Sequence, residues 1–218
     1  MTIKLTYDDK IAVLDLGDGE NRFSPDFLDE IDVMLDELVS AGVGGLVTTA
    51  SGKFYSNGLD LDWVSAHADL MSWYVGRVHA LLAKVLTLPI PTAAAVVGHA
   101  FGAGAMLAMA HDFRVMRDDR GFFCFPEVDI RIPFTPGMAA LIQAKLTPQA
   151  QVASMTTGRR FGGLDAAAVG IVDATAGEGA VSPAAIELLR PLAGKDAGTL
   201  AAIKATMFGP AVAALTGS

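Results

Sequence analysis

Residues 54–60 read Phe-Tyr-Ser-Asn-Gly-Leu-Asp, residues 98–104 read Gly-His-Ala-Phe-Gly-Ala-Gly, and residues 125–127 read Phe-Pro-Glu. Each of the two glycine-bearing turns comes after an apolar, strand-like run and before a helix-like one. Glycine lets the backbone bend sharply, so that N–H groups at the start of the next element can face a ligand. The sequence therefore predicts two strand–turn–helix units that bring backbone donors close to one carboxylate, Glu127.

The rest of the chain alternates strand-like runs with amphipathic helix-like runs. The expected strands cover residues 3–7, 11–16, 45–50, 92–97, 113–116 and 121–125. The expected helices cover residues 25–40, 70–86, 136–145, 148–156, 183–192 and 199–207, with a short helix and a strand in residues 159–173. Ser24 followed by Pro25 is typical of a helix start, with serine as the N-cap. This alternation favours crossover connections, and therefore an α/β fold with an at least partly parallel sheet.

Composition limits the classes of protein to which the chain can belong. Its 218 residues are 52% apolar and 18% charged, which fits one well-packed domain rather than a disordered segment. The formal charge of −8 argues against a nucleic-acid partner, because phosphate binding needs clustered Lys and Arg. The single cysteine, Cys124, lies in an apolar run, so we expect a buried, inert thiol and a reducing compartment.

Two segments bear on export and membranes. The segment Met1–Asp9 has early acids and lacks the apolar stretch of a signal peptide, which favours a cytoplasmic protein. No Asp, Glu, Lys or Arg occurs between Leu88 and Ala110, as in a membrane span. Prolines and glycines divide this stretch into a strand, a turn and a short helix, which is typical of a buried α/β element. We therefore expect no membrane partner.

The two turns and Glu127 together indicate a chemistry. The α-carbon of an acyl thioester is weakly acidic, and its deprotonation becomes feasible when two fixed N–H donors hold the enolate oxygen. We expect the backbone amides of Leu59 and Ala103 to be these donors, the second one aided by the helix dipole. The alternative is that both turns merely join strands to helices, which the acid that follows them disfavours.

Four stretches resemble the crotonase family of enoyl-CoA hydratases and isomerases, namely residues 52–61, 95–107, 111–114 and 125–128. The similarity runs over residues 3–175. It implies a crotonase-like (ClpP/crotonase) spiral of ββα units that assembles as a homotrimer or hexamer. It also implies an acyl-CoA substrate whose thioester carbonyl lies between the amides of Leu59 and Ala103, with no separate cofactor and no metal.

One position departs from the pattern of the family's hydratases. These enzymes carry two glutamates, because adding water across a double bond needs one carboxylate to orient the water and another to manage the proton. Here Met106 occupies the first position and Glu127 the second. A single carboxylate can instead move a proton from C2 to C4 of a 3-enoyl thioester, so the pattern resembles the Δ3-Δ2-enoyl-CoA isomerases. Burial among Phe123, Phe125 and Met106 should raise the pKa of Glu127.

Further residues complete the candidate substrate site by analogy with the family. Lys53 is expected to reach a CoA phosphate, and Asn57 to offer its backbone to the CoA moiety. Gly58 and Gly102 form the turns, and Met106 belongs to the acyl pocket.

Other polar residues near these motifs are expected to be structural. His99 is interpreted as a packing or hydrogen-bonding residue, and Asp60 and Asp62 as caps of the helix after the first turn. Asp129 would share a face with Glu127 if that stretch were extended, which leaves open a minor role as a second acid. The remaining histidines show no ligand-like grouping; they are His67, His79 and His111.

The sequence leaves two other classes of protein to be considered. A dinucleotide-binding protein is disfavoured, because residues 102–107 lack the final small residue of that fingerprint. A non-catalytic acyl-CoA-binding or scaffold protein of the same fold is a stronger rival, since Met106 already shows one catalytic position lost. Among enzymes, a weak hydratase, a hydrolase or a dehalogenase remains open.

The C-terminal region is short for the family. We expect residues 1–175 to form the core domain and residues 176–218 to form a helical trimerisation or lid region. The apolar helices after Pro183 could cover the acyl pocket of a neighbouring subunit.

Overall fold

A six-stranded sheet forms the centre of the computed structural model, which describes residues 3–217. The strand order is β1-β2-β4-β7-β9-β11. The strands are β1 (Lys4–Asp8), β2 (Ile11–Asp15), β4 (Gly45–Thr49), β7 (Thr92–Val96), β9 (Phe113–Arg117) and β11 (Ala174–Ala176). β1 and β2 form the expected antiparallel hairpin, and every other pair in this sheet is parallel.

A second, smaller sheet gathers the sequence motifs. It contains β5 (Phe54–Ser56), β8 (His99–Phe101) and β10 (Phe123–Cys124), with β8 in the middle and all pairs parallel. The chain therefore runs three times from a strand of the large sheet into a strand of the small one and then into a helix, which is the expected ββα spiral. Nearby, β3 (Arg22–Phe23) pairs with β6 (Gly58–Leu59).

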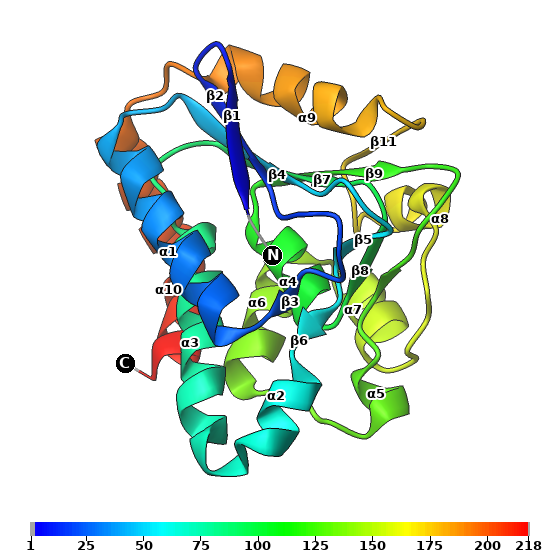
Figure 1. Cartoon of the computed structure of the whole chain (residues 1–218). Coiled ribbons are helices and arrows are strands. Elements are labelled where there is room, and N and C mark those ends of the chain that lie inside the picture. The colour runs from blue at the N-terminus through cyan, green and yellow to red at the C-terminus, as the bar shows by residue number, and fades with distance from the viewer. Residues whose placement is uncertain (1–2, 218) are drawn as a thin grey trace.

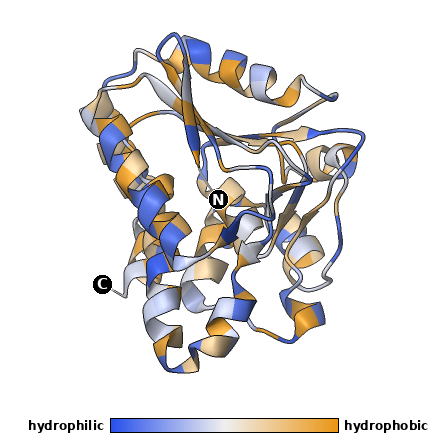
Figure 2. Ribbon diagram, in the orientation of Figure 1, coloured by the Kyte–Doolittle hydropathy of each residue, from blue (hydrophilic) through white to orange (hydrophobic). Residues whose placement is uncertain are grey.

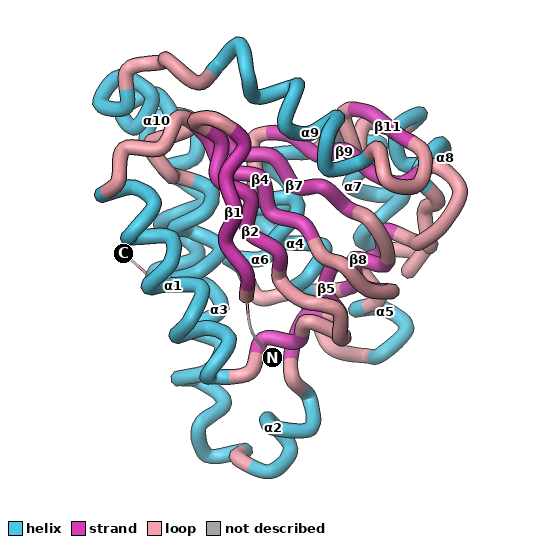
Figure 3. Tube along the Cα trace, turned by 45° about the horizontal axis from the view of Figure 1, so that its top comes forward, coloured by secondary structure: helices cyan, strands magenta, loops and turns pink. Residues whose placement is uncertain are grey.

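Helices cover both faces of the large sheet (Figures 1 and 3). The α-helices are α1 (Pro25–Ser40), α2 (Leu61–Ala66), α3 (Met71–Leu86), α4 (Ala103–Ala110), α5 (Glu127–Ile130), α6 (Pro136–Lys145), α7 (Pro148–Met155), α8 (Gly163–Ala168), α9 (Val181–Leu189) and α10 (Ala197–Thr216). Two short 3₁₀ segments are Ala68–Leu70 and Arg190–Leu192. The central helix α4 is buried along its whole length, α3 and α6 pack against it, and α10 packs against α3 and α6.

The core divides into two apolar clusters. The larger one lies among α1, α3, α4, α6 and the inner face of the large sheet. The smaller one joins Val181, Ala185 and Leu189 of α9 to the outer face, at residues such as Val47 and Val115. Apolar and polar residues alternate along α1 and α9, as expected for helices with one buried side (Figure 2).

Several sequence expectations are confirmed. Ser24 caps α1, because its side chain accepts a hydrogen bond from the Phe27 N–H group, and Pro25 opens the helix. The uncharged stretch from Leu88 to Ala110 forms β7, β8 and α4 inside the core rather than one long helix. Within the described residues, only α10 is long and apolar enough to cross a membrane, and it packs on α3 and α6 with the buried Lys204 in its middle.

Three expectations about the second half are wrong in part. The strand expected at residues 121–125 is reduced to Phe123–Cys124, and the strand expected within residues 159–173 forms later, at Ala174–Ala176. The last helix does not stop at residue 207 but continues through Pro210 to Thr216. Its packing on α3 and α6 compensates for the backbone hydrogen bond that proline cannot make.

A buried hydrogen-bond chain ties α4 to the sheets. The Tyr55 hydroxyl and the His111 Nε2 atom lie 2.8 Å and 3.0 Å from Thr48 Oγ1, and His111 Nδ1 lies 2.8 Å from the carbonyl oxygen of Leu107. A neutral imidazole satisfies this chain when Nδ1 donates to Leu107 and Nε2 accepts from Thr48. Burial lowers the pKa of His111 to about 4.

This network predicts a pH-dependent stability. Because the pKa of His111 is lower in the folded chain than in the unfolded chain, the unfolded chain binds more protons, and folding stability is lost as pH falls from 6.5 towards 4. The difference in unfolding free energy between the wild type and a His111→Gln variant should be about 2 kcal/mol larger at pH 7 than at pH 5. Urea titrations at both pH values measure it, and an equal difference at the two values would contradict the neutral, buried histidine.

Candidate active site

The two glycine turns touch each other. Gly58 has φ +78°, and a β-carbon on it would lie 2.8 Å from the Ala103 nitrogen and 2.8 Å from the Phe101 carbonyl oxygen. Likewise, a β-carbon on Gly104 would lie 2.4 Å from the carbonyl oxygen of Ser56. Both positions therefore require glycine, because only a residue without a side chain allows the two backbones to approach so closely. Leu59 follows Gly58 directly, so the structure brings Leu59 and Ala103 into one small region.

The first turn is held by two polar residues that the sequence reasoning missed. The Ser56 hydroxyl donates a hydrogen bond of 2.7 Å to the Asn21 carbonyl and accepts one of 3.1 Å from the Gly58 N–H group. The buried Asn21 side chain donates to the carbonyl groups of Gly17, Phe54 and Tyr55. Asn21 has φ +51°, which asparagine tolerates better than most residues, and this preference was the only signal in the sequence.

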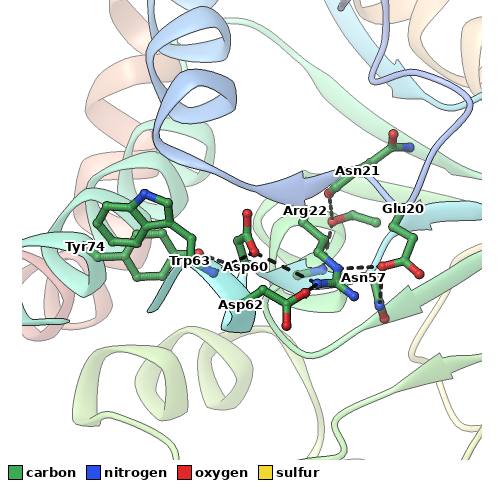
Figure 4. Close-up of polar contacts among 10 residues, drawn as sticks. Glu20, Asn21, Arg22, Asn57, Asp60, Asp62, Trp63 and Tyr74 are labelled. Carbon is green, nitrogen blue, oxygen red and sulfur yellow. Dashed lines mark hydrogen bonds and ion pairs between the residues drawn. The ribbon is translucent and has the colours of Figure 1, made fainter. Parts of the chain in front are cut away.

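An ionic cluster lies beside the same turn (Figure 4). Arg22 forms ion pairs with Glu20 at 2.5 Å and with Asp62 at 2.6 Å, and Asp60 lies 3.9 Å away. The Asn57 side chain donates to Glu20 at 3.3 Å. These contacts link the loop before β3 to the loop around β6.

The expected capping role is confirmed for Asp60 and is wrong for Asp62. The Asp60 carboxylate accepts a hydrogen bond from the Trp63 N–H group and so caps α2, and its own N–H group donates to the Tyr74 hydroxyl. Asp62 lies inside the first turn of α2, where its carboxylate pairs with Arg22 instead of capping.

The second turn and the carboxylate also meet. Gly102 has φ +51° and precedes α4, whose first residue is the buried Ala103. A β-carbon on Gly102 would lie 3.7 Å from Glu127 Oε1, so the carboxylate faces this turn. The structure therefore brings together all three features that the sequence singled out, namely the Gly58 turn, the Gly102 turn and Glu127.

Glu127 is a buried acid with spare hydrogen-bonding capacity. Glu127 is the first residue of the short helix α5 and is 9% exposed. Its Oε2 atom has no hydrogen-bond partner among the described residues. Burial raises its pKa to about 7, as expected. At neutral pH, the group therefore exists both as an acid and as a base, which suits proton transfer.

A cavity of about 340 Å³ adjoins Glu127. Val128, Ile132, Phe134 and Met155 contribute most of its apolar lining. Glu127 is the only carboxylate among its lining residues. Met106, in α4, is completely buried. Phe123 and Phe125, in and just after β10, are also completely buried, and the centres of their rings lie 5.6 Å apart in an edge-to-face arrangement. The surroundings of the acid are thus mainly apolar.

Basic and aromatic side chains surround His99, on the other side of β8 from the core. Its ring lies 5.0–5.6 Å from the rings of Phe54, Phe101 and Phe122, which confirms its packing role. Burial and the nearby charges of Lys53, Arg120 and Arg160 lower its pKa. Lys53 is exposed, with its ammonium 5.3 Å from the centre of the Phe54 ring.

Two further expectations have clear outcomes. Residues 127–130 are helical rather than extended, so Asp129 does not share a face with Glu127, and its carboxylate lies against Gly158 instead. The geometry therefore contradicts the possible role of Asp129 as a second acid.

Cys124 is buried, its thiol donates a hydrogen bond to the Gly158 carbonyl, and burial raises the pKa of the thiol to about 11, as expected of an inert thiol. Residues 3–217 contain no group of three or more His, Cys, Asp or Glu side chains arranged to hold a metal ion.

Comparisons with known proteins show the family to which the chain belongs. The model of the family "Enoyl-CoA hydratase/isomerase" matches residues 7–216. Peroxisomal enoyl-CoA delta isomerase 2 of Arabidopsis thaliana is 39% identical over 191 residues, which cover 82% of this chain and 79% of that protein. Enoyl-CoA delta isomerase 3 of the same plant is 38% identical over 188 residues, with the same coverage of both chains.

Solved structures share the fold. A probable enoyl-CoA hydratase from Mycobacterium tuberculosis superposes with a TM-score of 0.92 at 27% identity, covering 99% of this chain and 92% of the other. Human mitochondrial delta3-delta2-enoyl-CoA isomerase superposes with a TM-score of 0.88 at 22% identity, covering 97% and 84%. The expected crotonase-like fold is therefore confirmed, and the chain is an enzyme that belongs to the enoyl-CoA hydratase/isomerase family.

Proposed function

We propose that this enzyme is an enoyl-CoA isomerase that moves the double bond of a 3-enoyl-CoA to the 2-position. The observation that carries the proposal is that Glu127 faces the Gly102 turn as the only carboxylate lining its cavity. Met106 stands where the family's hydratases carry their other glutamate. The naming of the Arabidopsis relatives as delta isomerases supports the same reaction.

In the proposed reaction, the thioester carbonyl lies between the backbone amides of Leu59 and Ala103. The ionised Glu127 carboxylate removes a proton from C2, and the electron pair moves onto the carbonyl oxygen to give a dienolate. The two amides stabilise the negative oxygen. Protonated Glu127 then returns the proton to C4, and the double bond shifts to C2–C3 as the carbonyl re-forms. Every atom of the substrate is kept, so this carboxylate ends the cycle ionised, as it began.

The binding of the CoA part is proposed from charge. Lys53, Arg120 and Arg160 surround His99 near the first turn, and their positive charge suits the phosphate groups of CoA. The backbone of Asn57, next to Gly58, is within the same turn. Lys53 is proposed as a substrate-binding residue on this ground, and Asn57, Gly58, Gly102 and Met106 are proposed by analogy with the family.

Assembly and location extend the proposal. We propose a homotrimer or hexamer, in which apolar residues of the C-terminal helix region 176–218 contact a neighbouring subunit. A cytoplasmic location stays a prediction, while two of the Arabidopsis relatives are named as peroxisomal.

Product analysis tests the proposed reaction. The purified protein should convert a 3-enoyl-CoA into the conjugated 2-enoyl-CoA, and it should form no 3-hydroxyacyl-CoA from a 2-enoyl-CoA, because a second carboxylate to orient water is missing. Absorbance of the conjugated thioester and chromatography of the products measure the two reactions in parallel. Hydration as the main reaction would contradict the proposal, and tight binding of both thioesters with neither reaction would favour the non-catalytic alternative.

A further inference from the structure

A second cavity has a volume of about 480 Å³. Its walls come from α10, from Pro91 just before β7 and from Phe113 at the start of β9. The segment with β8 and the Gly102 turn follows the opposite end of β7, and none of the residues that line this cavity lines the cavity beside Glu127. The second cavity is therefore a separate feature of the molecule.

The lining of this cavity is largely apolar and open to solvent. Leu200, Ile203, Met207 and Phe208 of α10 form one wall. Ile203 and Met207 are 48% and 63% exposed, so a ligand can reach the cavity without unfolding the helix. The size and lining are typical of small-molecule sites, which are mostly apolar with a few placed polar groups.

One buried ion pair at the cavity is already satisfied. The Lys204 ammonium lies 2.7 Å from the Asp112 carboxylate and 2.9 Å from the Ile90 carbonyl oxygen. The same Asp112 oxygen also accepts hydrogen bonds from the N–H and hydroxyl groups of Thr92. Lys204 and Asp112 therefore neutralise each other and leave little charge for a ligand.

Lys145 is different, because it forms no ion pair among the described residues, and the carboxylates of Asp173 and Asp112, which pair with Arg114 and Lys204, act on its charge only from a greater distance. Its ammonium donates a hydrogen bond of 2.8 Å to the His111 carbonyl and lies 5.1 Å from the centre of the Phe208 ring. Among the described residues, no carboxylate lies within 4.0 Å of it, which is the distance of an ion pair. Burial lowers its pKa to about 8, so the group is still mainly protonated at pH 7. A partly buried positive charge thus borders an apolar cavity.

We propose that this cavity binds an amphiphilic carboxylate, such as a fatty-acid anion, with the carboxylate at Lys145 and the hydrocarbon chain along Ile203, Met207 and Phe208. The charge of Lys145 selects an anionic head group, and charge-assisted hydrogen bonds are the strongest that a lysine can make. The apolar wall of α10 offers the chain a place out of water. This site is independent of the isomerase reaction and requires no chemistry of Glu127.

Decanoate is a suitable probe, with decanol and decyltrimethylammonium as neutral and cationic probes of similar length. Protein labelled with ¹³C at the methionine methyl groups reports the site, because Met207 lies in this cavity and Met155 lines the one beside Glu127. A Met207→Leu variant assigns the signal. Decanoate should move the Met207 signal, and the two other probes should bind at least tenfold more weakly.

The matched variants are Lys145→Met and Lys4→Met. Lys145→Met removes the charge and keeps the apolar stem, and the His111 carbonyl keeps its second donor, the Arg114 side chain, so the fold should be preserved. We expect Lys145→Met to weaken decanoate binding about tenfold, the value of one charged hydrogen bond. Lys4 is exposed on β1, away from the cavity, and its replacement should leave the affinity within twofold.

Three results would overturn the proposal. The first is that decanoate leaves the Met207 signal unmoved, or moves only that of Met155. The second is equal binding of decanoate and decanol, or equal affinity of the wild type and Lys145→Met. The third is that the Met207 signal changes with protein concentration alone and decanoate does not compete, because the cavity is then covered by a second copy of the chain.

Discussion

The Glu127→Gln variant is expected to lose isomerase turnover by roughly 10³-fold while it keeps its fold and its affinity for the thioester. Glutamine has the same shape as glutamate but cannot take up the proton from C2. Glu127 faces the Gly102 turn, and no other carboxylate lines its cavity, so no neighbouring acid can replace it. Stopped assays of 3-enoyl-CoA conversion, with thermal unfolding as a check of folding, measure this effect.

Glu37→Gln is the matched control, because Glu37 is an exposed glutamate on α1 and should tolerate the change without loss of activity. The wild type adds a second readout. Glu127 must be ionised to act as the base, and its pKa is raised to about 7, so kcat/KM should fall as pH drops below 7. Unchanged turnover in Glu127→Gln, or a wild-type profile that is flat between pH 5 and pH 8, would contradict the assigned role.

Replacing Gly58 by alanine should have the second-largest effect. The new β-carbon would lie 2.8 Å from the Ala103 nitrogen and 3.0 Å from the Gly104 nitrogen, in backbone that cannot rotate away. The two turns would have to separate, and the amides of Leu59 and Ala103 would no longer meet at one oxygen. Because losing one such donor costs about 10²–10³-fold in kcat, we expect a loss of that order in Gly58→Ala.

Gly42→Ala separates this effect from backbone strain. Gly42 has φ +67°, close to the +78° of Gly58, but no described atom lies within 4 Å of its β-carbon position. Both variants should lose stability, by about 1–2 kcal/mol for the left-handed backbone. Only Gly58→Ala should lose turnover. If the two variants kept equal kcat values, the close approach of the turns would have no part in catalysis.

The sequence predicted the meeting of the motifs from the strand–turn–helix pattern around each glycine turn and from the resemblance to the crotonase family. Gly58, Gly102 and Glu127 come after β5, β8 and β10, which are neighbours in one sheet, and the ends of neighbouring parallel strands lie at the same edge. The strands β5 and β8 lie within the segments that were expected to be turns, so the small sheet itself was not predicted from the pattern of residues. The raised pKa of Glu127 followed from the apolar residues on either side of it.

The parts that sequence reasoning missed depend on contacts between distant, non-periodic residues. Asn21 and Ser56 hold the first turn through single hydrogen bonds between two loops. The periodicity of apolar residues along the chain does not indicate such contacts. The strands β3 and β6 contain two residues each, which is too short for an alternating pattern. The helix through Pro210 and the cavity around Lys145 arise from packing of α10 against segments far away in the sequence.

The fate of one proton tests the central claim, that a single buried carboxylate shifts the double bond. The same isomerisation is run in deuterium oxide with a 3-enoyl-CoA, and early product is examined by proton magnetic resonance. Since Glu127 is 9% exposed, it should carry the substrate's own proton from C2 to C4, so that most product molecules lack deuterium at C4. One solvent deuterium at C4 in every product molecule, or a 3-hydroxyacyl product, would contradict the account.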